Sequence, residues 1–142
     1  MLMHQLLTEG ALRHPDRTAF VWVDRARRLS YAQAAEQMER MAGLLAHLGV
    51  KKGDRVTVFA HNGMDYLIAM LGAWRIGAIA ALVNVKFHHE LAYYLDDHRP
   101  RVVVYTHDMR AAVEAAVARV PGVEHLVCMD GAQEGALSLP EL

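Results

Sequence analysis

The nine histidines are the side chains of this sequence best suited to hold a metal ion or to move a proton. Their densest group is His88-His89-Glu90, at the expected start of a helix. Adjacent residues of a helix point in different directions, and no second histidine or carboxylate follows at the i+4 spacing of helical zinc sites. We therefore predict no metal site here and interpret the group as the exposed N-terminus of a helix.

Phosphate-binding loops are not indicated by the glycines. The sequence contains no G-x-G, the core of the dinucleotide fingerprint. Gly72 and Gly77 have the spacing of the other common phosphate loop, but Ala78-Ile79 follow where that loop has a lysine and a hydroxyl residue. Such a loop could neither neutralise phosphate nor hold Mg²⁺, so helix packing explains both glycines better.

The candidate nucleophile and the paired carboxylates do not indicate a catalytic site either. Cys128, the only cysteine, stands in an apolar stretch without a flanking base, which predicts a buried thiol rather than a nucleophile. Asp96-Asp97 end a predicted helix, where pairing with Arg99 or Arg101 explains them better than acid–base catalysis. We therefore name no catalytic, cofactor-binding or metal-binding residue.

The bulk composition fits one α/β domain. The chain has 142 residues, 54% of them hydrophobic and 22% charged, with a formal net charge of -1, so it carries no disorder signature and no basic field for nucleic acid. The N-terminus does not resemble a signal peptide, and charged or polar residues interrupt residues 63–85 too often for a transmembrane segment. With a single cysteine, these features lead us to expect a cytoplasmic protein.

The first half of the chain predicts two helices and a strand pair. A helix is expected over residues 4–13, a strand over 18–23 and a short partner strand over 28–30. Ser30 and Gln33 form a capping box for a long helix that Gly49 would end. One face of that helix is apolar: Tyr31, Ala34, Ala35, Met38, Met41, Ala42, Leu45 and Leu48.

The second half alternates strands with helices. The expected strands cover residues 55–60, 78–83, 102–105 and 124–129, and the almost wholly apolar 78–83 reads as a central strand covered on both faces. Asn62 would cap a helix with Tyr66, Leu67, Met70, Leu71 and Trp74 facing inward. A further helix would cover 89–98, and Asp108 would cap the last. The fold class is therefore α/β, with a mainly parallel sheet flanked by helices.

The last residues carry a signal of their own. Residues 130–135 form a small polar loop, and Ser138-Leu139-Pro140-Glu141 is a capping box with proline in the first turn, a good helix start. No helix follows it, which favours an interrupted domain over a chance match in a frayed tail.

Several segments, in their order and spacing over residues 15–105, resemble the adenylate-forming acyl-CoA synthetases. They are Leu29-Ser30-Tyr31 with Leu48-Gly49-Val50, the turn Lys52-Gly53-Asp54-Arg55-Val56, the stretch Gly72–Ala78 after Asn62, and Asn84 with Glu90-Leu91. There are departures: Leu82 and Val85 replace prolines common in the family, and the loop before Glu90 is about one residue short. A capping Ser or Thr near His88 is also missing.

The resemblance implies a reaction in two halves. A carboxylate attacks the α-phosphate of ATP to give acyl-AMP and pyrophosphate, and coenzyme A then displaces AMP. The family's ATP- and Mg²⁺-handling motifs lie downstream of this segment, so residues 1–142 correspond to a partial N-terminal domain that stops before the phosphate-binding loop. No cofactor is expected in the fragment itself, whereas ATP, Mg²⁺ and coenzyme A are implied for the whole enzyme.

Three hypotheses follow. The first is the scaffold portion of an ATP-dependent acyl-CoA synthetase, inactive alone and partnered by the rest of the synthetase or by self-association through an exposed apolar face. The second is a non-catalytic binding or assembly module that keeps the synthetase scaffold. The third is a small unrelated α/β nucleotide binder, which ATP binding would favour.

Overall fold

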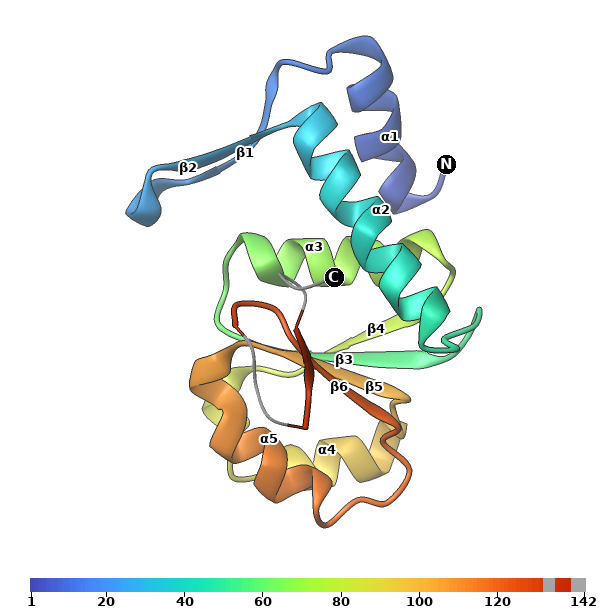
Figure 1. Cartoon of the computed structure of the whole chain (residues 1–142), viewed down its shortest axis with the longest axis vertical. Helices are drawn as coiled ribbons and strands as arrows, with labels where there is room; N and C mark the ends of the chain where they lie inside the picture. The colour runs from blue at the N-terminus through green and yellow to red at the C-terminus, as the bar shows by residue number, and fades with distance from the viewer. Residues whose placement is uncertain (132–134, 139–142) are drawn as a thin grey trace.

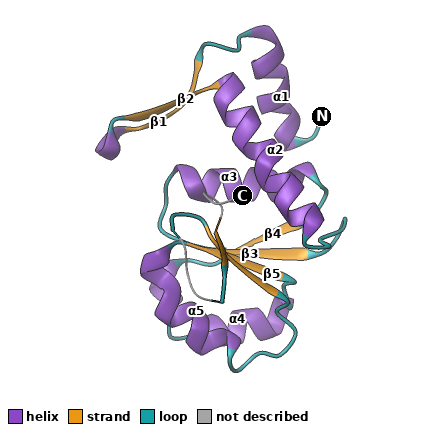
Figure 2. Ribbon diagram, viewed as in Figure 1, coloured by secondary structure: helices purple, strands orange, loops and turns teal. Residues whose placement is uncertain are grey.

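Two parts follow one another along the long axis of the molecule (Figure 1). The computed structural model describes residues 1–131 and 135–138. The first part holds α1 (Met3–Arg13), the strands β1 (Thr18–Trp22) and β2 (Arg27–Ser30), and the start of α2 (Tyr31–His47). The second is an α/β body around a parallel sheet (Figure 2). None of the helices in the described ranges is long and apolar enough to cross a membrane.

The N-terminal part follows the sequence closely. β1 and β2 pair antiparallel across a short 3-10 turn, η1 (Val23–Arg25). Ser30 Oγ accepts a hydrogen bond from the Gln33 amide at 3.1 Å, and Gln33 Oε1 accepts one from the Ser30 amide at 2.9 Å, which confirms the capping box. Gly49 has a φ of 83°, the left-handed conformation expected just after a helix end.

Within the described residues the sheet has five strands, in the order β4-β3-β5-β6-β7. The strands are β3 (Arg55–Phe59), β4 (Ile79–Leu82), β5 (Val102–Tyr105), β6 (His125–Cys128) and the two-residue β7 (Leu137–Ser138). All neighbouring pairs are parallel. The predicted fold class is therefore confirmed, whereas β7 was not predicted.

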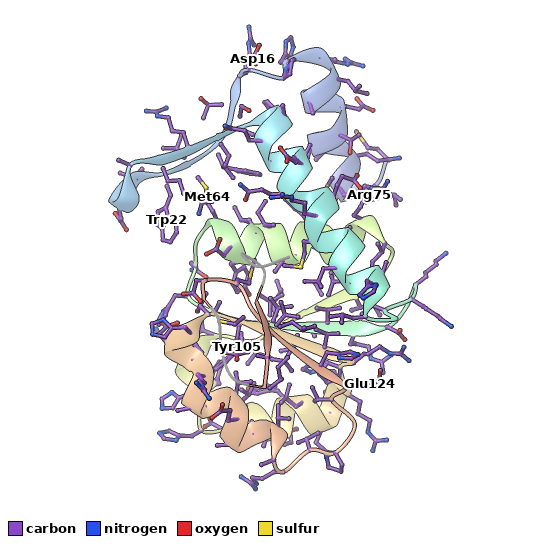
Figure 3. All side chains as sticks on the ribbon, viewed as in Figure 1. Asp16, Trp22, Met64, Arg75, Tyr105 and Glu124 are labelled. Carbon is purple, nitrogen blue, oxygen red and sulfur yellow. The ribbon has the colours of Figure 1, made fainter. Side chains whose placement is uncertain are left out.

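Helices cover both faces of the sheet (Figures 1 and 2). On one face, α2 and α3 (Met64–Arg75) bury a cluster that includes Leu45, Val58 and Ile68. On the other, α4 (Leu91–His98) and α5 (Arg110–Val117) bury a second cluster around Leu95 and Tyr105, the latter labelled in Figure 3. β5 lies between the two clusters and is buried along its whole length.

The position of β4 contradicts the prediction made from its sequence. Residues 78–83 read as a central strand, but in the described part of the chain β4 is the outermost strand and pairs with β3 alone. Ile79 is 53% exposed and Leu82 44% exposed. The apolar composition of a strand indicates that its two faces are buried by other elements. It does not specify which strand lies beside it.

Two predicted helix caps are also wrong. Gly63, not Asn62, occupies the N-cap of α3, and no side chain caps that helix. Asp108 lies inside the 3-10 turn η3 (His107–Met109), and α5 begins after it with Met109 as the N-cap. In both cases an Asx residue close to a helix start was read as its cap, although the intervening turn carries it away from the helical amides.

The inward face of α3 was only partly predicted. Its buried residues are Met64, Ile68, Ala69, Leu71, Gly72 and Ala73. Of the predicted set only Leu71 is buried, and Tyr66, Leu67, Met70 and Trp74 are half-buried. α3 is covered by the sheet and by α2, so small residues facing α2 are buried as completely as the large ones facing the sheet.

Smaller differences concern α4 and the end of the chain. α4 begins at Leu91, so the exposed His88 and His89 precede it, and the 3-10 turn η2 (Val85–Phe87) comes first. Arg101 pairs with Asp54 and Glu124 rather than with the Asp96-Asp97 pair, and Arg99 donates to the backbone carbonyl of Asp96. Ser138 ends β7, and the rest of the predicted helix start lies outside the described residues.

Candidate functional site

Polar side chains gather at one edge of the sheet, where the parallel strands end. His61 follows β3, Lys86 follows β4, Asp108 follows β5 and Asp130 follows β6. The carboxyl ends of parallel strands meet at a single edge, and open α/β sheets bind their ligands there. This edge is the candidate functional site of the described chain.

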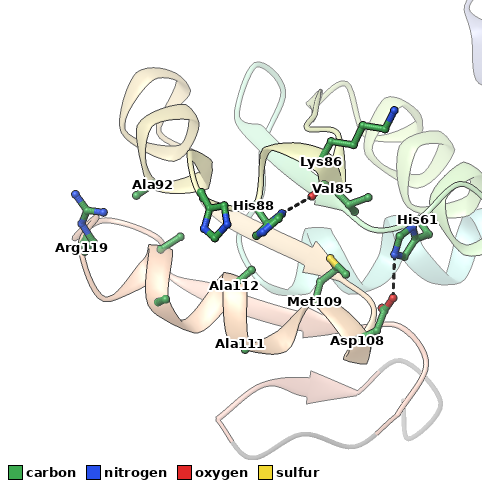
Figure 4. A pocket seen from close by; sticks show the side chains of 13 residues that line it. His61, Val85, Lys86, His88, Ala92, Asp108, Met109, Ala111, Ala112 and Arg119 are labelled. Atoms are coloured by element: carbon green, nitrogen blue, oxygen red, sulfur yellow. Dashed lines mark hydrogen bonds and ion pairs between the residues drawn. The ribbon is translucent and has the colours of Figure 1, made fainter.

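A groove of about 710 Å³ runs from this edge between the segment leading into α4 and the length of α5, as far as Arg119 (Figure 4). Its floor is formed by small or apolar side chains, Val85, Ala92, Met109, Ala112 and Ala116. Its rim carries polar ones, His61, Lys86, His88, His89, Asp108 and Arg119. The rim therefore holds two permanent cations and one carboxylate.

His61 and Asp108 join two of these loops (Figure 4). His61 Nε2 lies 3.3 Å from Asp108 Oδ2, and the Thr106 hydroxyl donates to Asp108 Oδ1 at 2.6 Å. The side chains of His61 and Asp108 are 63% and 45% exposed, so the pair stabilises the loops only weakly. The contact gives Asp108, the one carboxylate among the described residues on the rim of the groove, a partner in His61.

The groove continues along the edge as a longer trough. A hollow of about 510 Å³ shares His61, Val85 and Lys86 with the groove and also touches Asn62, Tyr66 and Leu82. A third hollow, of about 540 Å³, shares Asn62 and Tyr66 with the second and reaches the hairpin at Trp22. Trp22 extends from the hairpin toward Met64, as Figure 3 shows.

Cys128 lies just below this edge and is fully buried. Burial raises the pKa of its thiol, the hydrogen bonds of the Asp130 and Gly131 backbones oppose that rise, and the Asp130 carboxylate reinforces it. The thiol lies 3.4 Å from Asp130 Oδ1 and stays protonated at neutral pH. The predicted burial of the Cys128 thiol is confirmed, and its lack of a nucleophilic role stays a prediction.

The histidine pair at the groove is exposed, and its rings contact each other with centroids 3.9 Å apart. His88 Nδ1 lies 3.2 Å from the Val85 carbonyl. Within residues 1–131 and 135–138, no three His, Cys, Asp or Glu side chains come together as metal ligands.

The motif residues singled out in the sequence have structural partners. Asp54 Oδ2 accepts from the Lys51 amide at 2.9 Å, and Arg55 donates to the carbonyls of His98 and Arg99. The Asn84 side chain accepts from the Lys86 amide at 2.9 Å and so caps η2. These residues hold the turns on either side of β3 and β4 in place.

A family model described as AMP-binding enzyme matches residues 7–140. The chain belongs to this family. It corresponds to the N-terminal part of the adenylate-forming acyl-CoA synthetases and ligases, as the resemblance implied.

The relatives of this chain are named for different acids. A 4-hydroxybenzoate–CoA/benzoate–CoA ligase of Rhodopseudomonas palustris is 29% identical over 85% of the chain and 23% of its own length. A medium/long-chain-fatty-acid–CoA/3-oxocholest-4-en-26-oate–CoA ligase of Mycobacterium marinum is 36% identical over 84% and 22%. The chain thus spans less than a quarter of the length of these curated relatives.

The fold comparison agrees. A solved structure named as a long-chain-fatty-acid CoA ligase, from Rhodopseudomonas palustris, superposes with a TM-score of 0.91 and 27% identity, covering 99% of this chain and 36% of its own. The architecture described above is therefore the architecture of this part of an AMP-binding enzyme.

No site residue was predicted from the sequence in this segment, and that absence stays a prediction. What it missed is the meeting of His61 with Asp108 across the groove. Their one shared signal is position, because each follows the carboxyl end of a strand of the sheet by two or three residues. Asp108 was instead assigned as a cap, and His61 was not singled out.

Proposed function

We propose that these 142 residues are the scaffold portion of an ATP-dependent acyl-CoA synthetase and are inactive by themselves. The observation that carries the proposal is the family match over residues 7–140 in a chain that spans under a quarter of its curated relatives. In the whole enzyme a carboxylate oxygen attacks the α-phosphorus of ATP and pyrophosphate leaves. The coenzyme A thiol then attacks the acyl carbon and AMP leaves.

The proposal gives this chain no chemical step. Two observations support this: the sequence has neither G-x-G nor the lysine and hydroxyl residue of the other common phosphate loop, and the motif residues hold turns in place. Their contribution is to build one α/β layer and the trough at its edge. The partner is the remainder of the synthetase, in the cytoplasm, and in its absence a second copy can cover the exposed apolar residues.

Measuring ATP–pyrophosphate exchange tests the proposal. The purified 142-residue chain is incubated with ATP, Mg²⁺ and a panel of aromatic and fatty carboxylic acids, with the Mycobacterium marinum ligase as the positive control. We expect no exchange above a protein-free blank and no heat of ATP binding by calorimetry. Exchange by the chain alone would refute the proposal, and ATP binding alone would favour a small nucleotide binder.

A chimera tests the scaffold role directly. The chain replaces the segment that it matches in the Mycobacterium marinum ligase, and we expect the chimera to recover adenylation of a fatty acid. A well-folded chimera without any adenylation, beside an isolated chain that is a monodisperse monomer with a sharp thermal transition, would favour the non-catalytic binding or assembly module instead.

A further inference from the structure

Strand β4 has the composition of a central strand in the position of an edge strand. Ile79-Ala80-Ala81-Leu82 contains no polar residue, which is typical of parallel strands covered on both faces. In the described chain it forms one end of the sheet. The two facts agree if the sheet continues beyond β4.

The burial of side chains also changes abruptly between β3 and β4. Four of the five residues of β3 are buried, and all four of β5, whereas none of the four residues of β4 is. Successive side chains of a strand point to opposite faces. Exposure of Ile79 at 53% and Leu82 at 44% therefore means that both faces are open at this end, so covering elements as well as a neighbouring strand are lacking.

The backbone of β4 is open on the same side. The Ile79 amide donates to the Asp54 carbonyl at 2.8 Å, and the Val83 amide donates to the Val58 carbonyl at 3.2 Å. Alternation along the strand then directs the amides of Ala80 and Leu82 away from β3, to the outer edge. A parallel or antiparallel strand laid there would pair with both.

Edge strands that stay exposed usually carry protection. Natural proteins place lysine, proline or a bulge in such strands, because an open row of amides and carbonyls otherwise pairs with another chain. β4 has no charge and no proline, and its register with β3 runs without a shift from Ile79 to Leu82. It is built to be covered.

We propose that the outer edge of β4 is a docking site for a β-strand, with its covering elements, from the remainder of the synthetase. The inference rests on the proposed function. The matched proteins carry roughly three to five times as much chain as this segment, and one of them superposes on 99% of it, so the added chain packs around this same fold.

Hydrogen exchange of the backbone amides tests the proposal. Exchange at Ala80 and Leu82 is measured in the dilute isolated chain and in the chimera with the Mycobacterium marinum ligase. We expect both amides to exchange at least about a hundredfold more slowly in the chimera, with Val58 and Val104 as protected internal references. Equal exchange in the two proteins overturns the proposal.

The outcomes separate this proposal from the proposed function. A chimera that adenylates fatty acid while Ala80 and Leu82 exchange freely refutes the docking site and leaves the scaffold role intact. Protection without adenylation does the reverse. A defined dimer of the isolated chain that Leu82→Lys converts to monomer, with no extra protection in the chimera, makes a second copy the occupant and overturns the assignment.

A second measurement holds even if the chimera does not fold. In the isolated chain, the double substitution Ile79→Lys and Leu82→Lys is expected to leave the urea midpoint unchanged, because those side chains await a partner. Val58→Lys, on the buried neighbouring strand, is the matched control and should unfold the chain. A large loss of stability in the β4 variant would show that the edge is already covered and would overturn the proposal.

Discussion

Gly72 lies where α2 and α3 come closest. A Cβ atom at this position would stand 2.7 Å from the Met41 Cβ and 3.2 Å from the Ala42 backbone nitrogen. Real carbon atoms do not approach a neighbouring Cβ so closely, so the helices would have to move apart. The absence of a side chain at Gly72 therefore sets the spacing of the two helices.

Gly72→Ala should consequently lower the free energy of unfolding by about 1–3 kcal/mol, the usual cost of overpacking. Gly43→Ala is the matched control, since it also lies within a helix but nothing stands within 4 Å of its added Cβ. We expect it to raise stability by about 0.5–1 kcal/mol through helix propensity. Urea unfolding measures both, and equal effects would contradict the packing argument.

His98 makes the stability of the chain depend on pH. Its Nε2 lies 2.6 Å from the hydroxyl of the fully buried Thr57. Desolvation lowers the pKa of His98 below its ordinary value of 6.5, the Asp97 carboxylate opposes this, and Arg55 adds to it. The folded state therefore prefers neutral His98, and the stability it contributes is present above pH 6.5 and lost as the pH falls through the folded pKa.

Lowering the pH from about 7.5 to about 5.5 should accordingly reduce the free energy of unfolding, and part of that loss should vanish in His98→Gln. Urea titrations of both proteins at the two pH values give the comparison. If the wild type and the variant lose the same amount, His98 does not carry the effect.

At the scale of elements, the start of α2 depends on a reciprocal pair of hydrogen bonds. Ser30→Ala removes the acceptor for the Gln33 amide and leaves that amide without its cap. We expect a loss of about 1 kcal/mol in the free energy of unfolding. Ala32→Ser, an exposed change in the first turn that keeps the cap, should cost only a few tenths of that. Circular dichroism followed during thermal unfolding distinguishes the two.

Helices and strands that are marked by a pattern of consecutive residues were predicted well. Which elements lie beside one another in space was not. The capping box of α2 is written in consecutive residues and is confirmed, and most of the predicted apolar face is buried. Tyr31, Ala35 and Leu48 of that face are only half-buried, and the buried Leu44 was not predicted. The order of the strands is set by crossovers between distant segments, so the edge position of β4 could not be seen in its composition. Likewise, no local pattern brings His61 to Asp108, which are joined only when β3 and β5 pair.

At the scale of the whole molecule, Arg101 connects segments that are far apart in the chain. It donates to the Gly49 carbonyl at 2.7 Å and lies 3.4 Å from Asp54 and 3.6 Å from Glu124. One side chain thus links the end of α2, the turn before β3 and the turn before β6. Its guanidinium is about one-third exposed, so the contacts are only partly screened.

Arg101→Gln should therefore lower the free energy of unfolding by about 1–2 kcal/mol, and Arg101→Lys should recover only part of this, because lysine keeps the charge without the planar fork. Arg40→Gln, on the exposed side of α2, serves as control and should change little. Full recovery by lysine would show that charge alone matters.

The buried thiol also gives this chain a reporter of its own. Cys128 is the only cysteine, and it is fully enclosed in β6 between two neighbouring strands. A colorimetric thiol reagent can modify it only while the sheet is transiently parted, so labelling rates report how often that happens under native conditions, without any introduced dye or tag. Slower labelling of Cys128 after a binding partner is added would show that the partner makes the sheet part less often.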